Sequence, residues 1–471
     1  MLNQVEYYWD KNVRRCIGEY CGGDFTNPKS FTAEYLVGYG EAMVWEGKEE
    51  GWVSTPKDGF HWILDKGLDI FRSVWDRRNT LSVIDVEYFN VDFGGEIYFK
   101  QKTTFRKLEN FYRCIMDVYK QYGLNVIVLV TGQGYHFVTK VTRDSEAEKM
   151  LTEIGYVIPS LAGKYEHPNP GSRRARPVVL NHGKCFDGMG KVMEYLSQKL
   201  IREAHRWNVD LPIVTTDVAV GSGRTGREAV SIDLSMYADP IFMRDIRCAF
   251  SSHQKHKVQR YKVGDRIADR VPVQITLPRG GLSLDDLFEL RRHFRNSANY
   301  AANCNCMIPA SDQAFVKLIE EYKKSELYKF HQDFDKTQDD PWFDWHKTYN
   351  RFNLHDIPPC TRYALQFPNP HLMKPTNLQN LARCLLSIGW HPKHIAGLVR
   401  SKYEQDYGWG KSWDKYDAAS RAFYYIRMFC GQVTTGLDQG IDHNCISQKQ
   451  KGYCLQPFCG YDLGKYFPGN R

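Results

Sequence analysis

Four cysteines in the last quarter of the chain have the type and spacing of ligands for a soft metal centre. Cys360 follows two prolines, and Cys445, Cys454 and Cys459 lie close together in a glycine-rich, irregular segment. Thiolates are soft donors that favour iron–sulfur clusters or zinc. We therefore expect these four thiols to meet at one metal site, and the residues alone leave both kinds of metal open.

Two acidic residues on a predicted strand form a second constellation. Residues 81–89 are mostly apolar and β-branched, which predicts a buried strand, and they include Asp85 and Glu87. Side chains two apart on a strand point to the same face, where two carboxylates repel each other unless a cation lies between them. Asp233 has a similar apolar strand context in 229–234. Three such acids could hold two Mg²⁺ or Mn²⁺ ions about 3.5–4 Å apart, the arrangement used for phosphoryl transfer. An exposed strand without metal is the alternative.

Groups that could bind phosphate follow these acids along the chain. In the run from Thr131 to His136, two glycines, Gly132 and Gly134, let the backbone approach a ligand closely, and a histidine ends the run. Residues 244–262 contain six Lys or Arg and two His against one acid. Within them, four side chains could donate to anionic oxygens: Arg247, Ser251, His253 and Lys255. A hairpin turn and a solvated basic face are the alternatives.

The elements that must position these residues can be read from the apolar pattern. A helix is expected over 105–122, ending at Gly123, and strands are expected over 125–130 and 135–141. This order of strand, helix and strands favours an α+β sheet domain. Further helices are expected over 190–207, 377–388, 392–403 and 413–429. Residues 278–312 begin and end with helix breakers and are expected to be a connector, and its Cys304-x-Cys306 pair is a weak metal signal, for which ordinary cysteines are the favoured interpretation.

Length and composition limit the class of protein. The chain has 471 residues, enough for two or three domains, and a net charge of +8. It contains no apolar run approaching the roughly 18 residues of a membrane span, and its first residues lack the apolar region of a signal peptide. We therefore expect a cytoplasmic protein with no membrane partner. Thirteen cysteines in a reducing compartment are expected to be free or metal-bound.

Taken in order, the acids, the glycine turn and the basic segment resemble the three motifs of the archaeo-eukaryotic primase superfamily, over roughly residues 75–265. The family usually has serine where this chain has Thr131, and often a second aspartate where it has Glu87. The resemblance implies a primase catalytic core with an RRM-like mixed sheet, in which the three acids are catalytic and bind Mg²⁺ or Mn²⁺. It assigns nucleotide binding to seven residues: Thr131, Gly134, His136, Arg247, Ser251, His253 and Lys255.

Residues 350–465 are similar to the iron–sulfur domain of the primase large subunit, which is mainly α-helical and holds a [4Fe–4S] cluster. The resemblance implies that the cluster is held by the four cysteines described above, with Cys430 as an alternative to Cys459 and zinc as the alternative metal. It also implies that Tyr425 and Arg427, in the run Tyr424-Tyr-Ile-Arg427, lie near the template and the initiating nucleotide. Cys384 has a helical apolar spacing and is expected in the core.

These resemblances imply an enzyme, a DNA-template-dependent primase or primase-polymerase. It would make primers de novo on single-stranded DNA from NTPs or dNTPs, for replication of a phage, plasmid or other mobile element and then in the host cytoplasm. The implied domains are a catalytic domain over 1–278, a helical linker over 279–345 and an iron–sulfur domain over 346–471. The sequence has no Gly-x4-Gly-Lys-Ser/Thr loop, so a separate replicative helicase is the expected partner. The alternatives are a metal-dependent nuclease or phosphodiesterase with an iron–sulfur domain, and a non-catalytic nucleic-acid-binding accessory protein.

Overall fold

A computed structural model describes residues 3–48, 50–166, 177–215, 227–238, 244–367, 369, 371–405 and 417–468. Within these ranges the fold is built on a six-stranded mixed sheet. Its strands, in spatial order, are β12 (Leu277–Pro278), β5 (Ile127–Val130), β6 (Gly134–Thr142), β4 (Asn79–Asn90), β8 (Glu228–Asp233) and β7 (Ile213–Thr215). Neighbours are antiparallel except for the parallel pair β7 and β8.

The central strand, β4, has an apolar face and a polar face because its side chains alternate. Ile84 and Val86 lie opposite Phe137 and Tyr135 of β6, and these aromatic rings pack against side chains of α6 (Gln101–Tyr122). Helix α9 (Leu180–Ala204) covers the same face beside α6. Asp85 and Glu87 alternate with these core residues and therefore point to the other face of the sheet.

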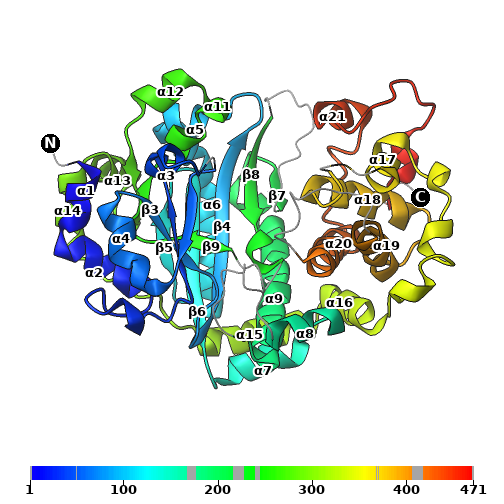
Figure 1. Ribbon diagram of the computed structural model, residues 1–471, viewed down its shortest axis with the longest axis horizontal. Coiled ribbons are helices and arrows are strands. Elements are labelled where there is room, and N and C mark those ends of the chain that lie inside the picture. The colour runs from blue at the N-terminus through cyan, green and yellow to red at the C-terminus, as the bar shows by residue number, and fades with distance from the viewer. Residues whose placement is uncertain are drawn as a thin grey trace.

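The N-terminal part of the chain forms a second layer on the left of Figure 1. Here a four-stranded sheet has the order β2 (Trp52–Thr55), β1 (Leu36–Tyr39), β3 (Asp69–Ser73) and β9 (Asp245–Arg247), and β10 (Ser252–His253) pairs with β11 (Gln274–Ile275). Helix α1 (Gln4–Trp9) packs on α2 (Lys11–Tyr20) and α4 (Phe60–Asp65), and α14 (Phe294–Ala301) contacts both α1 and α2. The basic segment thus contributes strands to two small sheets.

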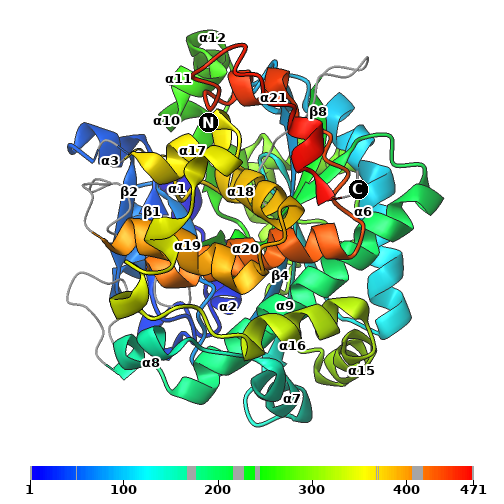
Figure 2. The same ribbon diagram turned by 90° about the vertical axis from the view of Figure 1, so that its right-hand side faces the viewer.

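Helices dominate the C-terminal part, on the right of Figure 1 and facing the viewer in Figure 2. They are α16 (Glu326–Lys336), α17 (Pro359–Gln366), α18 (Pro375–Ser387), α19 (Pro392–Glu404), α20 (Ala418–Thr434) and α21 (Cys445–Gln450). Helices α16, α18 and α19 all pack against α20. The remaining α-helices in the described ranges are α3 (Glu41–Trp45), α5 (Glu96–Phe99), α7 (Glu146–Ile154), α8 (Pro159–Glu166), α10 (Lys255–Val258), α11 (Arg260–Val263), α12 (Asp265–Arg270), α13 (Leu284–Arg291) and α15 (Asp312–Lys323).

The C-terminal helices dock against the edge of the central sheet formed by β7 and β8. The Tyr424 hydroxyl of α20 donates to the Leu234 carbonyl oxygen at 2.6 Å, directly after β8. At the other end of β8, Arg227 donates to the Gln450 side chain of α21 at 2.7 Å. Both ends of the strand that carries Asp233 therefore contact the helical part.

Most of the expected elements are confirmed, and the mixed α+β class is correct. Helix α6 ends where expected, at Gly123, whose φ of +78° is the left-handed conformation that favours glycine. The expected helix over 190–207 begins ten residues earlier, at Leu180. For the helix expected over 413–429, α20 begins at Ala418, and residues 413–416 lie outside the described ranges. No helix in the described ranges has the length and apolar character needed to cross a membrane.

The expected connector differs most from the structure. Leu277–Pro278 is a strand of the central sheet, and residues 284–301 form α13 and α14 rather than a linker. Arg279 forms an ion pair with Glu109 of α6 at 2.7 Å. This segment, which begins and ends with helix breakers, is therefore part of the N-terminal fold. Strand pairing and the ion pair with α6 stabilise it.

Candidate functional site

The candidate site lies on the polar face of β4, where strand register brings the predicted acids together. Asp85 is directly opposite Asp233 of β8 on one side and His136 of β6 on the other. Directly opposed residues share a face, so all three side chains project to the same side as Glu87. The Asp85 Oδ1 atom lies 3.3 Å from His136 Nε2. Three acids and one imidazole that are distant in sequence thus form a single cluster.

The glycine turn before β6 fits closely against the other two predicted motifs. A Cβ atom at Gly134 would lie 1.8 Å from the Val86 carbonyl oxygen, and one at Gly132 would lie 2.3 Å from the His253 ring. Both positions exclude any side chain. The Thr131 hydroxyl oxygen accepts the Gly134 N–H at 3.1 Å and so stabilises the turn. Thr131 and Gly134 shape the turn, and no hydrogen bond of theirs points to the acids.

Lys255 is the basic residue of the third motif that reaches the acids. Its Nζ atom donates to the Gln133 side-chain oxygen at 2.5 Å and lies 3.9 Å from Glu87 Oε1. About a third of the Lys255 side chain and a fifth of the Glu87 side chain remain exposed. A ligand could therefore contact both side chains without unfolding the site. Sequence reasoning assigned no role to Gln133, although it occupies the centre of the glycine turn.

The acids repel one another, and the pKa of Glu87 reflects this. Burial, together with the charges of Asp85 and Asp233, raises the pKa of Glu87 to about 7, although Lys255 opposes the shift. The buried Asp85 Oδ1 atom has no hydrogen-bond partner. Acids on one face of two paired strands, with the pKa of Glu87 raised and the Asp85 Oδ1 atom without a hydrogen bond, fit divalent cations, which would relieve the repulsion. No three ligand atoms of these described acids and His136 lie within 4.8 Å of one another, so they would surround an ion from a wider spacing.

The structure does not bring Arg247 and Ser251 to the acids. Arg247 is buried and forms an ion pair with Asp69 of β3 at 2.6 Å. The Ser251 hydroxyl is also buried, where it accepts the Ile70 N–H at 2.8 Å and donates to the Ser252 carbonyl oxygen at 3.0 Å. Both side chains are engaged in joining the basic segment to β3. Asp69, a buried acid on a strand, was the missing signal that this arginine has an internal partner.

His253 lies between the glycine turn and the core. Its side chain is almost fully buried, and burial, followed by the nearby charge of Arg247, lowers its pKa well below the ordinary value. The imidazole is therefore neutral at physiological pH. Its ring packs against Gly132, so the expected direct contact with a triphosphate would need a shift of the ring.

The four C-terminal cysteines predicted to be ligands all line one cavity. Cys360 comes from the start of α17, Cys445 from the start of α21, and Cys454 and Cys459 from the loop that follows. Burial raises the pKa of Cys360 to about 11, and the other three thiols add to this effect. The resemblance-based grouping of these four residues thus agrees with the geometry.

Cys430 lies apart from this cavity. It is fully buried in the middle of α20, where burial strongly raises the pKa of its thiol. Cys384 is also buried, in contact with the Thr361 hydroxyl, as expected for a core cysteine. The geometry therefore favours Cys459 over Cys430 as the fourth thiol of the cavity.

The four cavity thiols are not in close mutual contact. No three of these four described sulfurs lie within 4.8 Å of one another. Four sulfurs bound to one zinc ion at about 2.3 Å would be only about 3.8 Å apart. These sulfurs would therefore have to move closer together to bind one zinc ion.

Tyr425 and Arg427 do not face solvent or the acids. Tyr425 is fully buried in α20. Arg427 forms ion pairs with Asp187 at 2.8 Å and Glu194 at 2.6 Å, both on α9. Arg427 thus joins α20 to α9 by ion pairs, instead of being exposed for the expected template contact. Tyr424, which the sequence analysis did not single out, is the residue of this run that reaches the end of β8.

Comparison with known proteins gives no further identification. No protein-family model matches the chain, and no curated protein sequence matches it either.

Proposed function

We propose that this chain is a primase-polymerase, an enzyme that starts and extends nucleic-acid strands on a single-stranded DNA template. The observation that carries the proposal is the register of Asp85 against Asp233, with Glu87 two residues away and Lys255 beside it. Acids on adjacent strands flanked by basic groups are what nucleotidyl transfer needs. The order of the three sequence motifs supports the same assignment.

In the proposed reaction a 3′-hydroxyl attacks the α-phosphorus of an incoming nucleoside triphosphate, and pyrophosphate leaves. Asp85, Glu87 and Asp233 would hold two divalent cations, which favour ionisation of the hydroxyl and stabilise charge on the phosphates. Lys255 is the side chain that can donate to the triphosphate, since its ammonium group already lies at the edge of the acids. The imidazole of His136 lies 3.3 Å from Asp85 and could also donate to phosphate.

The C-terminal part supports initiation in this proposal. Its four-thiol cavity would hold a [4Fe–4S] cluster, with Cys360, Cys445, Cys454 and Cys459 as ligands, and such a cluster rigidifies the loop after α21. Contacts at Leu234 and Arg227 fix this helical part against β8. It therefore lies beside the strand that carries Asp233, where a template or a first nucleotide could be held.

The deciding experiment uses the full chain and unprimed single-stranded DNA. The protein is incubated with Mn²⁺ or Mg²⁺ and with ribonucleotides or deoxyribonucleotides in turn, and the products are sized. We expect new strands that begin with a 5′-triphosphate, and none from the Asp85→Asn variant. Shortening of the template without new strands would instead indicate a nuclease. Binding with neither change would indicate an accessory protein.

A further inference from the structure

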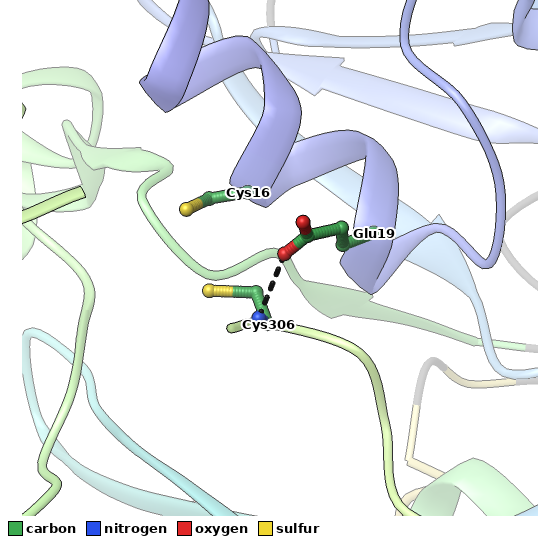
Figure 3. Close-up of side chains that lie close together, drawn as sticks. All are labelled: Cys16, Glu19 and Cys306. Carbon is green, nitrogen blue, oxygen red and sulfur yellow. Dashed lines mark hydrogen bonds between the residues drawn. The ribbon is translucent and has the colours of Figure 1, made fainter. Parts of the chain in front are cut away.

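A third group of side chains that could bind a metal lies outside the acid cluster and the C-terminal cavity. Figure 3 shows Cys16 and Glu19 on α2 facing Cys306, which follows α14. The two sulfurs and one carboxylate oxygen all lie within 4.8 Å of one another. Both cysteines are fully buried. Residues three apart on a helix share a face, so α2 presents a thiol and a carboxylate together.

The carboxylate of this group is already held in place. Glu19 Oε2 accepts the Cys306 N–H at 2.9 Å, and Glu19 Oε1 is 2.5 Å from Arg15. Arg15 also donates to the carbonyl oxygens of Ala301 and Cys304 at 2.8 and 3.0 Å. These contacts orient Glu19 in the way that outer hydrogen bonds orient metal ligands, and they fix the loop that carries Cys306.

We propose that Cys16, Glu19 and Cys306 bind one zinc ion that joins the N-terminal helices to the segment after α14. Thiolate and carboxylate are zinc ligands, and their separation here is compatible with about 2.0–2.3 Å bonds to one ion. On binding, the thiols of Cys16 and Cys306 each release a proton, and Glu19 contributes an already ionised oxygen.

The site is structural because its thiols are buried and its ligands join distant parts of the chain. Its ligands come from positions 16, 19 and 306, and its thiols are buried, as in closed zinc sites. The ion would hold the N-terminal helices against the segment that follows the central sheet. This inference does not depend on the proposed polymerase activity.

Metal analysis of anaerobically purified full-length protein tests the site. We expect one zinc per chain, in addition to any iron, and loss of that zinc in the Cys16→Ser, Cys306→Ser double variant. A matched control lies next to the same helix, because Cys21 directly follows α2. Cys21 and Cys248 also form a buried pair, with sulfurs 3.7 Å apart, but without a carboxylate. The Cys21→Ser, Cys248→Ser variant should keep its zinc.

The wild-type protein gives a second test if the double variant does not fold. X-ray absorption at the zinc edge should show sulfur ligands at about 2.3 Å together with at least one oxygen ligand at about 2.0–2.2 Å. Replacement of zinc by Co²⁺ should give thiolate charge-transfer bands. Absence of stoichiometric zinc, or a zinc shell of four sulfurs, would overturn the proposal, since four sulfurs would place the ion in the C-terminal cavity.

Discussion

Asp85 of β4 and Asp233 of β8 lie directly opposite each other in an antiparallel pair. Like charges at such a position destabilise a sheet. Glu87 adds a third carboxylate on the same face. Its pKa is raised by burial and by the charges of the two aspartates. A sheet needs no such cluster for its own stability, so the acids are best explained by a cationic ligand, as the proposed two-metal reaction requires.

Neutralising either acid should remove activity without harming the fold. We expect Asp85→Asn and Asp233→Asn to abolish nucleotide incorporation while DNA binding is retained. Because each change also removes like-charge repulsion, the metal-free protein should gain about 0.2–1 kcal/mol in free energy of unfolding. Glu326→Gln, which alters an exposed surface ion pair, is the control and should change neither property. Persistent synthesis by both aspartate variants would remove the active-site assignment.

The raised pKa of Glu87 predicts an unusual pH dependence of stability. Its pKa is shifted from an ordinary 4.5 to about 7, so between these values the folded protein binds a proton that the unfolded chain releases. The free energy of unfolding of the metal-free protein should therefore fall as pH rises through this window, by up to roughly 3 kcal/mol. Urea unfolding with a chelator present measures this slope. In Glu87→Gln, and with saturating Mn²⁺, the slope should shrink; an unchanged slope in the variant would contradict the assignment.

Lys255 and Arg247, both in the basic segment, should respond differently to substitution. Lys255→Met removes a charged donor at the edge of the acids, so the nucleotide KM should rise by roughly 10–100-fold, equivalent to the loss of about 1.5–3 kcal/mol. Its stability should change little. Arg247→Met leaves Asp69 buried without its partner, which should lower the free energy of unfolding by about 3–5 kcal/mol. Steady-state kinetics and chemical unfolding separate the two effects, and a reversed pattern would refute the geometry.

Strand periodicity predicted that Asp85 and Glu87 share a face, because side-chain alternation along a strand is a local rule. Their convergence with Asp233 was expected from the order of the motifs, because β4 and β8 are far apart in the sequence. The orientation of the basic residues could not be predicted in the same way. Whether Arg247 points outward depends on Asp69, about 180 residues earlier, and a single sequence does not indicate that pairing. Cys16, Glu19 and Cys306 were missed for the same reason, since Cys304-x-Cys306 has no metal partner near it in the chain.

Arg427 should behave as a structural residue. Burial alone would raise the pKa of Glu194, but Arg427 and His331 lower it below its ordinary value, so the carboxylate stays charged in the interior. Arg427→Met would leave Glu194 and Asp187 without this partner and should cost about 3–5 kcal/mol of stability. If the variant folds, its template affinity should be that of wild type. Loss of template affinity with unchanged stability would restore the role suggested by the family resemblance.

The last prediction concerns which thiols hold the C-terminal metal. Cys459 lines the cavity with Cys360, Cys445 and Cys454, whereas Cys430 is fully buried in α20 away from it. Cys459→Ala should therefore lower the iron content and visible absorption of anaerobically purified protein, and Cys430→Ala should retain both. The pair is matched because each variant loses one thiol from the same helical region. Loss of iron in Cys430→Ala alone would favour the other ligand set. Zinc in place of iron at this cavity would mean that its sulfurs move closer together on binding, because a single ion requires spacings that the four thiols do not have.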